Sequence, residues 1–388
     1  MTPTYIVLVL VELHMNEMER RSPIELDDDI FNPTSDSEGT VAGAGLVALD
    51  ILIDDYVDRP IQVRAGGSCG NVLTILSSLA WESYPIARLG EDHVAQVIRA
   101  DMERWGVETQ MAASRPNGSS PIIIQRNNTD GHSFEFRCPG CDSYFPRFKR
   151  PLMDRTSKYL SNLPRVDVFY FDRAVPSAIT LAKQYRSNGA LVLFEPNKSS
   201  NRDLFERAVS ASHILKYSHD RDIHLGDIED PWLHIQTLGE HGLRFQFRNS
   251  SWNEMGAVKP KQVQDTSGAG DWCSAGLLHV LSDQWTGDTN DISCELVEEG
   301  LKFGQTLATM NCRYEGARGA LYYWEEDKLK QTVYCLHDHN NSKSASNSRH
   351  TSANENSKDQ NLTQSLDESD VGHCVCKTVH TVSTDAGK

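Results

Sequence analysis

Short apolar runs alternate with stretches of helical spacing from about residue 41 to residue 330. Apolar runs of roughly four to eight residues are typical of buried strands, whereas apolar residues that recur every three or four positions are typical of helices. The runs that indicate buried strands are Val166-Asp-Val-Phe-Tyr-Phe, Ala190-Leu-Val-Leu-Phe and His213-Ile-Leu-Lys. Residues 177–188 and 202–210 lie between them and have helical spacing. This alternation predicts a three-layer α/β/α sandwich with a mostly parallel central sheet.

The amino-terminal part of this region has a different pattern. Gly45-Leu-Val-Ala-Leu predicts a first strand, and residues 71–81 predict a helix after a glycine-rich turn. Pro121-Ile-Ile-Ile-Gln and Ser133-Phe-Glu-Phe-Arg flank Asn127-Asn-Thr-Asp-Gly, which is a hairpin signal. We therefore expect a small β lid, built from segments near 50–65 and 110–140, attached to the parallel sheet.

The two ends of the chain differ from the region between them. Residues 1–40 hold nine Asp or Glu side chains against Arg20 and Arg21, and they end in a polar run. Residues 331–388 are rich in Ser, Asn, His and Thr and contain few large apolar side chains. Such segments bury too little apolar surface to offset their ordering entropy. We expect a disordered acidic arm over 1–40, a single catalytic domain over 41–330 and a disordered tail over 331–388.

The overall charge and cysteine content narrow the classes of function. The net charge of -16 argues against nucleic acid or an anionic membrane as the main partner. Nine cysteines without a regular spacing do not indicate a disulfide framework. The apolar stretch Tyr5–Leu13 is too short to span a bilayer, and no basic residue precedes it as in a signal peptide. The cytoplasm is the expected compartment.

One glycine-rich segment, Asp265-Thr-Ser-Gly-Ala-Gly-Asp271, carries the strongest chemical signal. The small residues Gly268, Ala269 and Gly270 stand directly before an apolar, helix-like run from Trp272 to Leu281. Free amides at a helix N-terminus favour a bound anion. By spacing alone, Asp271 is equally well explained as an acidic residue in the first turn of a helix.

A second glycine-rich segment lies near the start of the domain. It reads Ala65-Gly66-Gly67-Ser-Cys-Gly70-Asn71 and is followed by Arg88-Leu-Gly90-Glu-Asp92. Asp50 stands upstream, at the end of the expected first strand. Taken alone, the paired glycines are explained by an ordinary turn and Asn71 by a helix N-cap.

Together these segments resemble the two signatures of the ribokinase-like (PfkB) carbohydrate kinases, in the order in which that family carries them. The resemblance covers roughly residues 41–330. It implies that Asp271 is the base that takes a proton from a substrate hydroxyl, while the amides of residues 268–270 form the anion hole for the transferred phosphoryl group. The residues that it assigns to substrate binding are Asp50, Gly66, Gly67 and Asn71.

The resemblance also implies a nucleotide site. The segment Ile235-Gln-Thr237-Leu-Gly239-Glu-His-Gly242 looks like the strand and turn that border ATP in the family, although an unremarkable glycine turn explains it too. Asn311 stands where the family has an adenine-side helix and loop. ATP and Mg²⁺ are therefore the expected cofactors, and a monovalent cation near Asp265 is a further implication of the resemblance.

One element of the family pattern is altered. An Asn-x-x-Glu element often orders magnesium and phosphate in the family, but here Ser218 and Arg221 stand at the Asn and Glu positions. Either another carboxylate, such as Asp220 or Glu195, takes over, or the metal is held differently. Catalytic efficiency is in question for this reason.

Other patterns carry weaker chemistry. Gly43-Ala-Gly45-Leu-Val-Ala48 fits a dinucleotide fingerprint, but we expect it at the start of a strand rather than after one, which argues against a nicotinamide site. No Gly-x-x-x-x-Gly-Lys-Ser/Thr segment occurs. Cys138 and Cys141 have the spacing of half a zinc site, but a turn within or after the lid hairpin explains them better.

These observations predict an ATP-dependent phosphotransferase that acts on a hydroxyl group of a small sugar or sugar-like molecule. Two alternatives stay open: a nucleoside kinase of the same fold, and a non-catalytic member that kept the pocket and regulates another process. A small molecule is the expected partner, with neither nucleic acid nor membrane, and the resemblance leaves room for a homodimer formed through the lid.

Overall fold

The computed structural model describes residues 39–54, 60–128, 131–151, 166–197, 201–221, 223, 231–248, 250–260 and 262–323. Residues 1–38 of the predicted acidic arm lie outside the described residues, and so does everything after residue 323, including the whole predicted tail. The first strand, β1 (Gly39–Ala44), begins slightly before the predicted domain boundary at residue 41.

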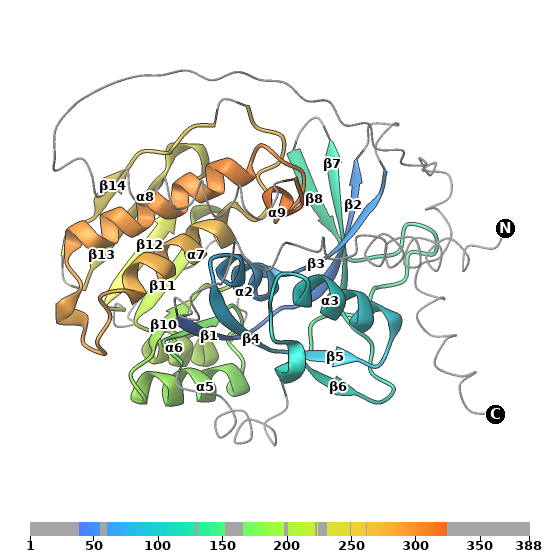
Figure 1. Ribbon diagram of the computed structural model, residues 1–388, viewed down its shortest axis with the longest axis horizontal. Helices are drawn as coiled ribbons and strands as arrows, with labels where there is room; N and C mark the ends of the chain where they lie inside the picture. The colour runs from blue at the N-terminus through green and yellow to red at the C-terminus, as the bar shows by residue number, and fades with distance from the viewer. Residues whose placement is uncertain are drawn as a thin grey trace, which may run out of the picture.

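The central sheet has eight strands in the order β14-β13-β12-β11-β10-β9-β1-β4 (Figure 1). Strands β4 to β12 in this order run parallel, and β13 and β14 are antiparallel additions at one edge. Every residue of β9 and of β10 is buried, which explains their uninterrupted apolar sequence in a sheet covered on both faces. The strands besides β1 are β4 (Trp81–Ile86), β9 (Val168–Phe171), β10 (Leu191–Phe194), β11 (Ile214–Ser218), β12 (Leu233–Thr237), β13 (Leu243–Phe247) and β14 (Asn253–Met255).

Helices cover both faces of this sheet, which confirms the predicted three-layer architecture (Figure 1). On one face lie α2 (Ser68–Ser78), α7 (Ala269–Ser282) and α8 (Cys294–Asn311), which form a core with residues such as Tyr170 and Ile235. On the other face, α5 (Pro176–Ser187) and α6 (Arg202–Ala211) pack against Phe169, Phe171 and Phe194. Successive sheet residues therefore point alternately into the two cores.

The predicted lid is a second sheet of four strands in the order β3-β2-β7-β8. These strands are β2 (Ala48–Asp54), β3 (Gln62–Gly66), β7 (Ile122–Asn128) and β8 (Gly131–Glu135). The expected hairpin is present, since β7 and β8 pair antiparallel with Asn128 opposite Gly131. Helix α3 (His93–Glu103) packs beneath the lid in a third core, and β5 (Arg88–Gly90) pairs with β6 (Ala113–Arg115) beside it. Figure 1 shows the lid beside α9 (Gly319–Tyr323), at one end of the central sheet.

The first strand differs from its prediction. Residues 45–49 do not form one strand: β1 ends at Ala44, and β2 begins at Ala48 in the other sheet. The Gly43-Ala-Gly45 segment therefore lies at the end of a strand, contrary to the expectation that it begins one. A Cβ at Gly45 would lie 2.0 Å from Asp172 Oδ1, so only glycine fits where the chain leaves the central sheet for the lid.

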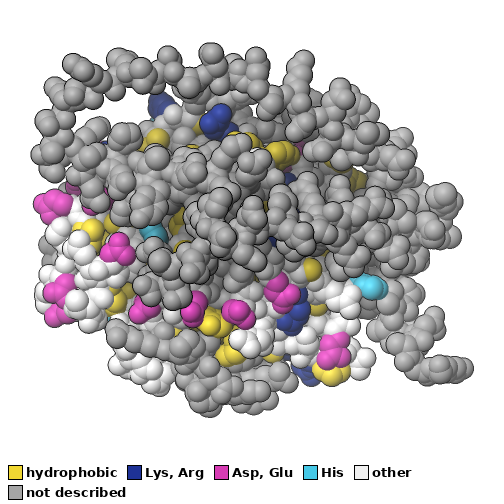
Figure 2. Space-filling model, in the orientation of Figure 1, with side chains coloured by type: hydrophobic (Ala, Val, Ile, Leu, Met, Phe, Trp, Pro, Cys, Tyr) yellow, Lys and Arg dark blue, Asp and Glu magenta, His cyan; other side chains and the backbone are white. Residues whose placement is uncertain are grey.

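The remaining short elements are 3₁₀ turns: η1 (Thr109–Met111), η2 (His219–Arg221), η3 (Gly239–His241) and η4 (Thr289–Asp291). In the described part of the chain, no helix has the length and apolar character needed to cross a membrane. Asp and Glu side chains gather along the lower left of the visible face (Figure 2), in keeping with the negative net charge.

Candidate active site

The ends of the parallel strands bring polar side chains to one edge of the central sheet. Asp172 follows β9, Glu195 follows β10, Ser218 ends β11 and Thr237 ends β12. Because these strands are parallel, their carboxyl ends meet at the same edge, where open α/β sheets bind ligands.

Helix α7 begins at this site, and its first turn is shaped by Gly268. That residue has φ +73°, and a Cβ on it would lie 2.3 Å from the Ala317 carbonyl oxygen, so only glycine fits. The Ala269 amide donates to Thr266 O at 3.2 Å, and the first helical hydrogen bond runs from Trp272 N to Gly268 O at 3.0 Å. The amides of Gly270 and Asp271 thus have no acceptor within the helix. Of the predicted anion-hole amides, that of Ala269 is already used in the turn.

Asp271 lies in this first turn and is buried, with 8% of its surface exposed. Its Oδ2 accepts a hydrogen bond from Asn71 Nδ2 at 2.8 Å, which joins two segments 200 residues apart. Burial, together with the negative charge of Glu195, raises the pKa of Asp271 to about 7. The Asn71 hydrogen bond and the cations Lys216 and Arg221 act in the opposite direction.

Asp50 lies in β2, where it pairs with Arg64 of β3, and Gly66 stands diagonally across from it at the end of β3. A Cβ on Gly66 would come within 1.8 Å of Asp50 Oδ2, and Gly67 has φ +81° with no room beside Leu46 O. Burial raises the pKa of Asp50 to about 7, although Arg318 and the Gly67 amide lower it. Two buried oxygens, Asp50 Oδ1 and Asn71 Oδ1, find no hydrogen-bond partner among the described residues. Unpaired buried acceptors of this kind are suited to bind hydroxyl groups.

A buried ion pair joins the sheet to the start of α7. Lys216 Nζ lies 2.7 Å from Glu195 Oε1 and donates to the Gly270 carbonyl oxygen at 3.0 Å. Burial alone would lower the pKa of Lys216, but Glu195 raises it above its ordinary value. The second carboxylate oxygen, Oε2, accepts from Ser274 Oγ at 2.5 Å. Sequence reasoning missed the role of Lys216, although a single charge inside the apolar strand β11 was a signal for it.

The altered Asn-x-x-Glu element contributes a cation. Arg221 Nη1 donates to the Pro196 carbonyl oxygen at 3.0 Å, and its charge lowers the pKa of Asp271. Glu195, which we considered as a substitute carboxylate, has both oxygens engaged, and Asp220 is exposed. The described residues contain no group of three or more His, Cys, Asp or Glu side chains arranged to hold a metal ion. A magnesium ion held mainly by protein carboxylates therefore does not fit this site, whereas one that arrives on nucleotide phosphates is compatible with it.

The predicted nucleotide residues fall into two places. Thr237, Gly239 and Gly242 form the turn between β12 and β13, where Gly242 has φ +98° and a Cβ would lie 2.1 Å from Met255 O. Asn311, at the end of α8, is completely buried and hydrogen-bonded within the protein. The nucleotide contact of Asn311 remains a prediction, and its burial argues for a different role.

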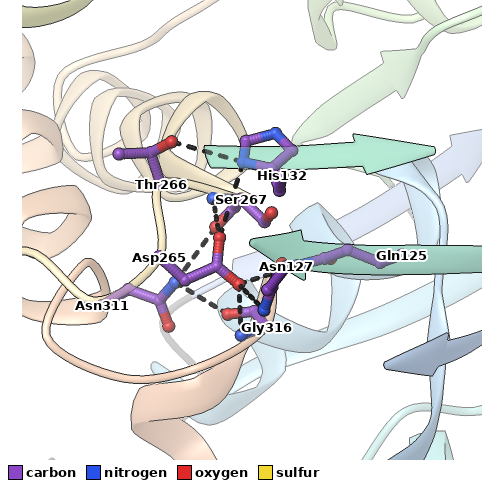
Figure 3. Close-up of polar contacts among 8 residues, drawn as sticks. All are labelled: Gln125, Asn127, His132, Asp265, Thr266, Ser267, Asn311 and Gly316. Carbon is purple, nitrogen blue, oxygen red and sulfur yellow. Dashed lines mark hydrogen bonds and ion pairs between the residues drawn. The ribbon is translucent and has the colours of Figure 1, made fainter. Parts of the chain in front are cut away.

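Asp265, at the start of the glycine-rich segment, is surrounded by hydrogen-bond donors (Figure 3). Its Oδ1 accepts from the Ser267 amide at 2.8 Å, and its Oδ2 accepts from the Gly316 amide at 2.8 Å. Two lid side chains, Gln125 Nε2 at 2.7 Å and Asn127 Nδ2 at 3.3 Å, also donate to Oδ2. Nothing in the spacing of the sequence indicated this contact between the lid and the core.

The two thiols after the lid hairpin lie in a turn, as predicted. Asp142 N donates to Cys138 O at 2.8 Å, and Cys138 is buried while Cys141 is exposed. The described residues place no third or fourth metal ligand beside them.

Sequence comparisons identify kinases as relatives. An aminoimidazole riboside kinase of Salmonella typhimurium is 25% identical over 277 residues, which cover 66% of this chain and 84% of that protein. A fructokinase of Klebsiella pneumoniae is 23% identical over 73% of this chain and 95% of its own length, and a ketohexokinase of Mus musculus is 22% identical over 73% and 99%. No protein-family model matches the chain.

Solved structures share the fold. A fructokinase from Xylella fastidiosa with bound ATP superposes with a TM-score of 0.60 at 15% identity, over 78% of this chain and 99% of that one. A nucleoside kinase from Burkholderia thailandensis in complex with inosine gives a TM-score of 0.57 at 15% identity, over 76% and 98%. The predicted resemblance and fold class are confirmed, and the predicted enzyme class, carbohydrate kinase, is that of the sequence relatives.

Proposed function

Because the chain resembles ribokinase-like carbohydrate kinases in sequence and in fold, we propose that it transfers the γ-phosphoryl group of ATP to a hydroxyl group of a small sugar. The observation that carries this proposal is the 2.8 Å hydrogen bond between Asn71 and Asp271. It joins the substrate-side glycine-rich segment to the anion-binding start of α7, so that a hydroxyl held by one segment lies beside the base of the other.

The substrate hydroxyls bind to the buried oxygens Asp50 Oδ1 and Asn71 Oδ1, which have no described protein partner. Asp271 orients the acceptor hydroxyl and takes its proton on a carboxylate oxygen as the oxygen attacks phosphorus. The bond from phosphorus to the leaving oxygen of ADP breaks as the new bond to the sugar oxygen forms. Positioning and charge stabilisation supply most of the catalysis in such a transfer.

The charge of the transferred group is met by the amides of Gly270 and Asp271 at the N-terminus of α7. Arg221 adds a positive charge close enough to lower the pKa of Asp271. Lys216 holds the Gly270 carbonyl and keeps this first turn in place. Mg²⁺ bound to the nucleotide would neutralise phosphate charge, and ATP is expected over the turn that contains Thr237, Gly239 and Gly242.

A nucleoside is the second candidate substrate. It is favoured by the relatives themselves, since one sequence relative is an aminoimidazole riboside kinase and one structural neighbour binds inosine. A sugar and a nucleoside both present ribose-like hydroxyls to Asp50, so the site chemistry described above serves either substrate.

The test is a panel of hexoses, pentoses and nucleosides, with ADP release measured in the presence of MgATP. Thermal-shift measurements with the same ligands first select those that bind. We expect ADP release to depend on one compound of the panel and to be lost in Asp271→Asn. If the protein binds ATP but phosphorylates no sugar or nucleoside, the non-catalytic alternative is correct instead.

A further inference from the structure

Asn311 connects three segments around the anion-binding turn (Figure 3). Its Nδ2 donates to the carbonyl oxygens of Ser267 at 3.3 Å and Gly316 at 3.2 Å, and its Oδ1 accepts from the Ala320 amide at 3.0 Å. The amide orientation is fixed by chemistry, because a backbone N–H only donates and a carbonyl only accepts. Asn311 is completely buried, so both of its N–H groups are committed to these two carbonyls.

Asp265 lies in the same cluster, and both of its carboxylate oxygens already accept hydrogen bonds. An ionised carboxylate offers about four acceptor positions. Here the Gly316 amide and the side chains of Gln125 and Asn127 donate to Oδ2, and the Ser267 amide donates to Oδ1, with His132 Nδ1 at 3.6 Å from that oxygen. A monovalent cation in a protein is held by converging oxygen atoms that replace its hydration shell. In this cluster the candidate oxygens, those of Asp265, Ser267 and Gly316, already accept hydrogen bonds.

We propose that protein N–H groups do at this site what a bound monovalent cation would otherwise do. The Asn311 amide draws the Ser267 and Gly316 carbonyls together, and the two lid amides donate hydrogen bonds to Asp265 Oδ2. The turn that leads into α7 is then held in its anion-binding shape without K⁺ or Na⁺. The cation that the family resemblance implied near Asp265 does not fit.

The arrangement also links the lid to the anion hole. Gln125 and Asn127 belong to β7, which pairs with β2 in the register Asp50 to Ile123 and Asp54 to Asn127. Strand β2, which carries the substrate-side Asp50, is thus hydrogen-bonded directly to β7, whose side chains donate to Asp265. Gln125 and Asn127 are positioning residues in this scheme, because they act on the turn and touch neither substrate nor nucleotide.

The deciding experiment measures the cation response of the full-length protein. After exchange into choline chloride, KCl or NaCl is added at constant ionic strength, and the thermal midpoint is followed. Because a cation that binds only the folded state stabilises it by mass action, a filled site would raise the midpoint by several degrees in a saturable way. We expect a difference below about 1 °C at cation concentrations far above those that fill specific sites. A saturable rise specific to K⁺ or Na⁺ overturns the proposal.

Variants show whether Asn311 is the substituting group. Asn311→Asp replaces the donating NH₂ by an acceptor that faces two carbonyls, so the variant should be less stable in choline chloride and regain stability in KCl. The matched control is Asn117→Asp, an exposed change outside the site at a left-handed position that Asp tolerates, which should show no K⁺ response. If Asn311→Asp is destabilised equally in both salts, Asn311 has only a packing role and the proposal fails. If this variant does not fold, the wild-type titration still decides.

The catalytic consequence rests on the proposed function. If the wild type is a kinase, its turnover should change less than about two-fold between choline chloride and KCl, whereas a cation-dependent enzyme would lose most of its rate. If no phosphoryl transfer is found with any substrate, the proposed function fails, but the thermal measurement still tests the cation proposal by itself.

Discussion

The pKa of Asp271 ties the proposed activity to stability. Folding raises this pKa from 3.8 to about 7, mainly through burial. The unfolded chain therefore ionises first as pH rises, so the folded state loses stability between pH 3.8 and about 7 and regains none above it. At about 1.4 kcal/mol per tenfold change in proton affinity, the difference corresponds to about 4 kcal/mol at neutral pH and above.

Replacing Asp271 by Asn removes the titrating carboxyl group and keeps the size and shape of the side chain. The amide oxygen of the new side chain can still accept from Asn71 Nδ2, but its NH₂ group must find a partner in the same buried place. We therefore expect the variant to be more stable than the wild type by roughly 1–3 kcal/mol, which is only part of the stability that the buried Asp271 carboxylate costs. The gain should be near zero at the lowest pH and should grow until pH passes the folded pKa.

The assay is equilibrium denaturation of wild type and Asp271→Asn between pH 4 and 9, run with ADP release at each pH where both are folded. Turnover should fall by about 10²–10⁴, the usual contribution of a general base. Asp50→Asn is the matched control, because burial raises the pKa of that residue to about 7 as well. It should stabilise the fold in the same pH window but weaken substrate binding instead of abolishing turnover.

Two results would refute this reasoning about Asp271. If Asp271→Asn shows the same stability difference at pH 4 as at pH 9, the carboxyl group is not held near neutral pKa in the folded protein. If turnover survives the substitution, the proton goes elsewhere and Asp271 is not the base.

Three further predictions follow from the same site. Gly268→Ala should lower the free energy of unfolding by at least about 1–2 kcal/mol, because residue 268 has a left-handed backbone and a Cβ there would clash with the Ala317 carbonyl. Gly270→Ala should be tolerated, because its Cβ would meet Glu195 at 3.4 Å, and denaturation of both variants checks the difference. Lys216→Met should destabilise by about 3–5 kcal/mol by leaving Glu195 buried and unpaired, and a second change, Glu195→Gln, should restore part of that loss in the same measurement. The turnover of the wild type should rise with pH to a plateau above about 7, as its base ionises; a pH–rate profile that falls across this range would contradict the assignment.

The periodicity of the sequence predicted most of the strands and helices, because buried strands and amphipathic helices leave local patterns. It failed between Gly45 and Leu49, where an apolar run continues without interruption although the chain passes from one sheet to the other. Burial on both sides of this crossing makes its composition resemble a single strand. What the pattern does not show is the close approach of the Asp172 carboxylate, which leaves room only for glycine at residue 45.

The candidate site was predicted through the resemblance, which placed Asn71 and Asp271 in one site before any geometry was known. The resemblance did not predict the contacts of Gln125 and Asn127 with Asp265. Gln125 lies in the apolar run of β7 and Asn127 at its end, in a hairpin signal, so spacing predicts a strand and a turn, and nothing in it points to Asp265. The hydrogen bond between Gln125 and Asp265 joins residues 140 positions apart. It depends on how the lid sheet packs against the segment before α7, and this packing involves the whole domain. Side chains that replace an ion leave no motif of their own, since a family signature preserves the residues that bind the ion and not those that make it unnecessary.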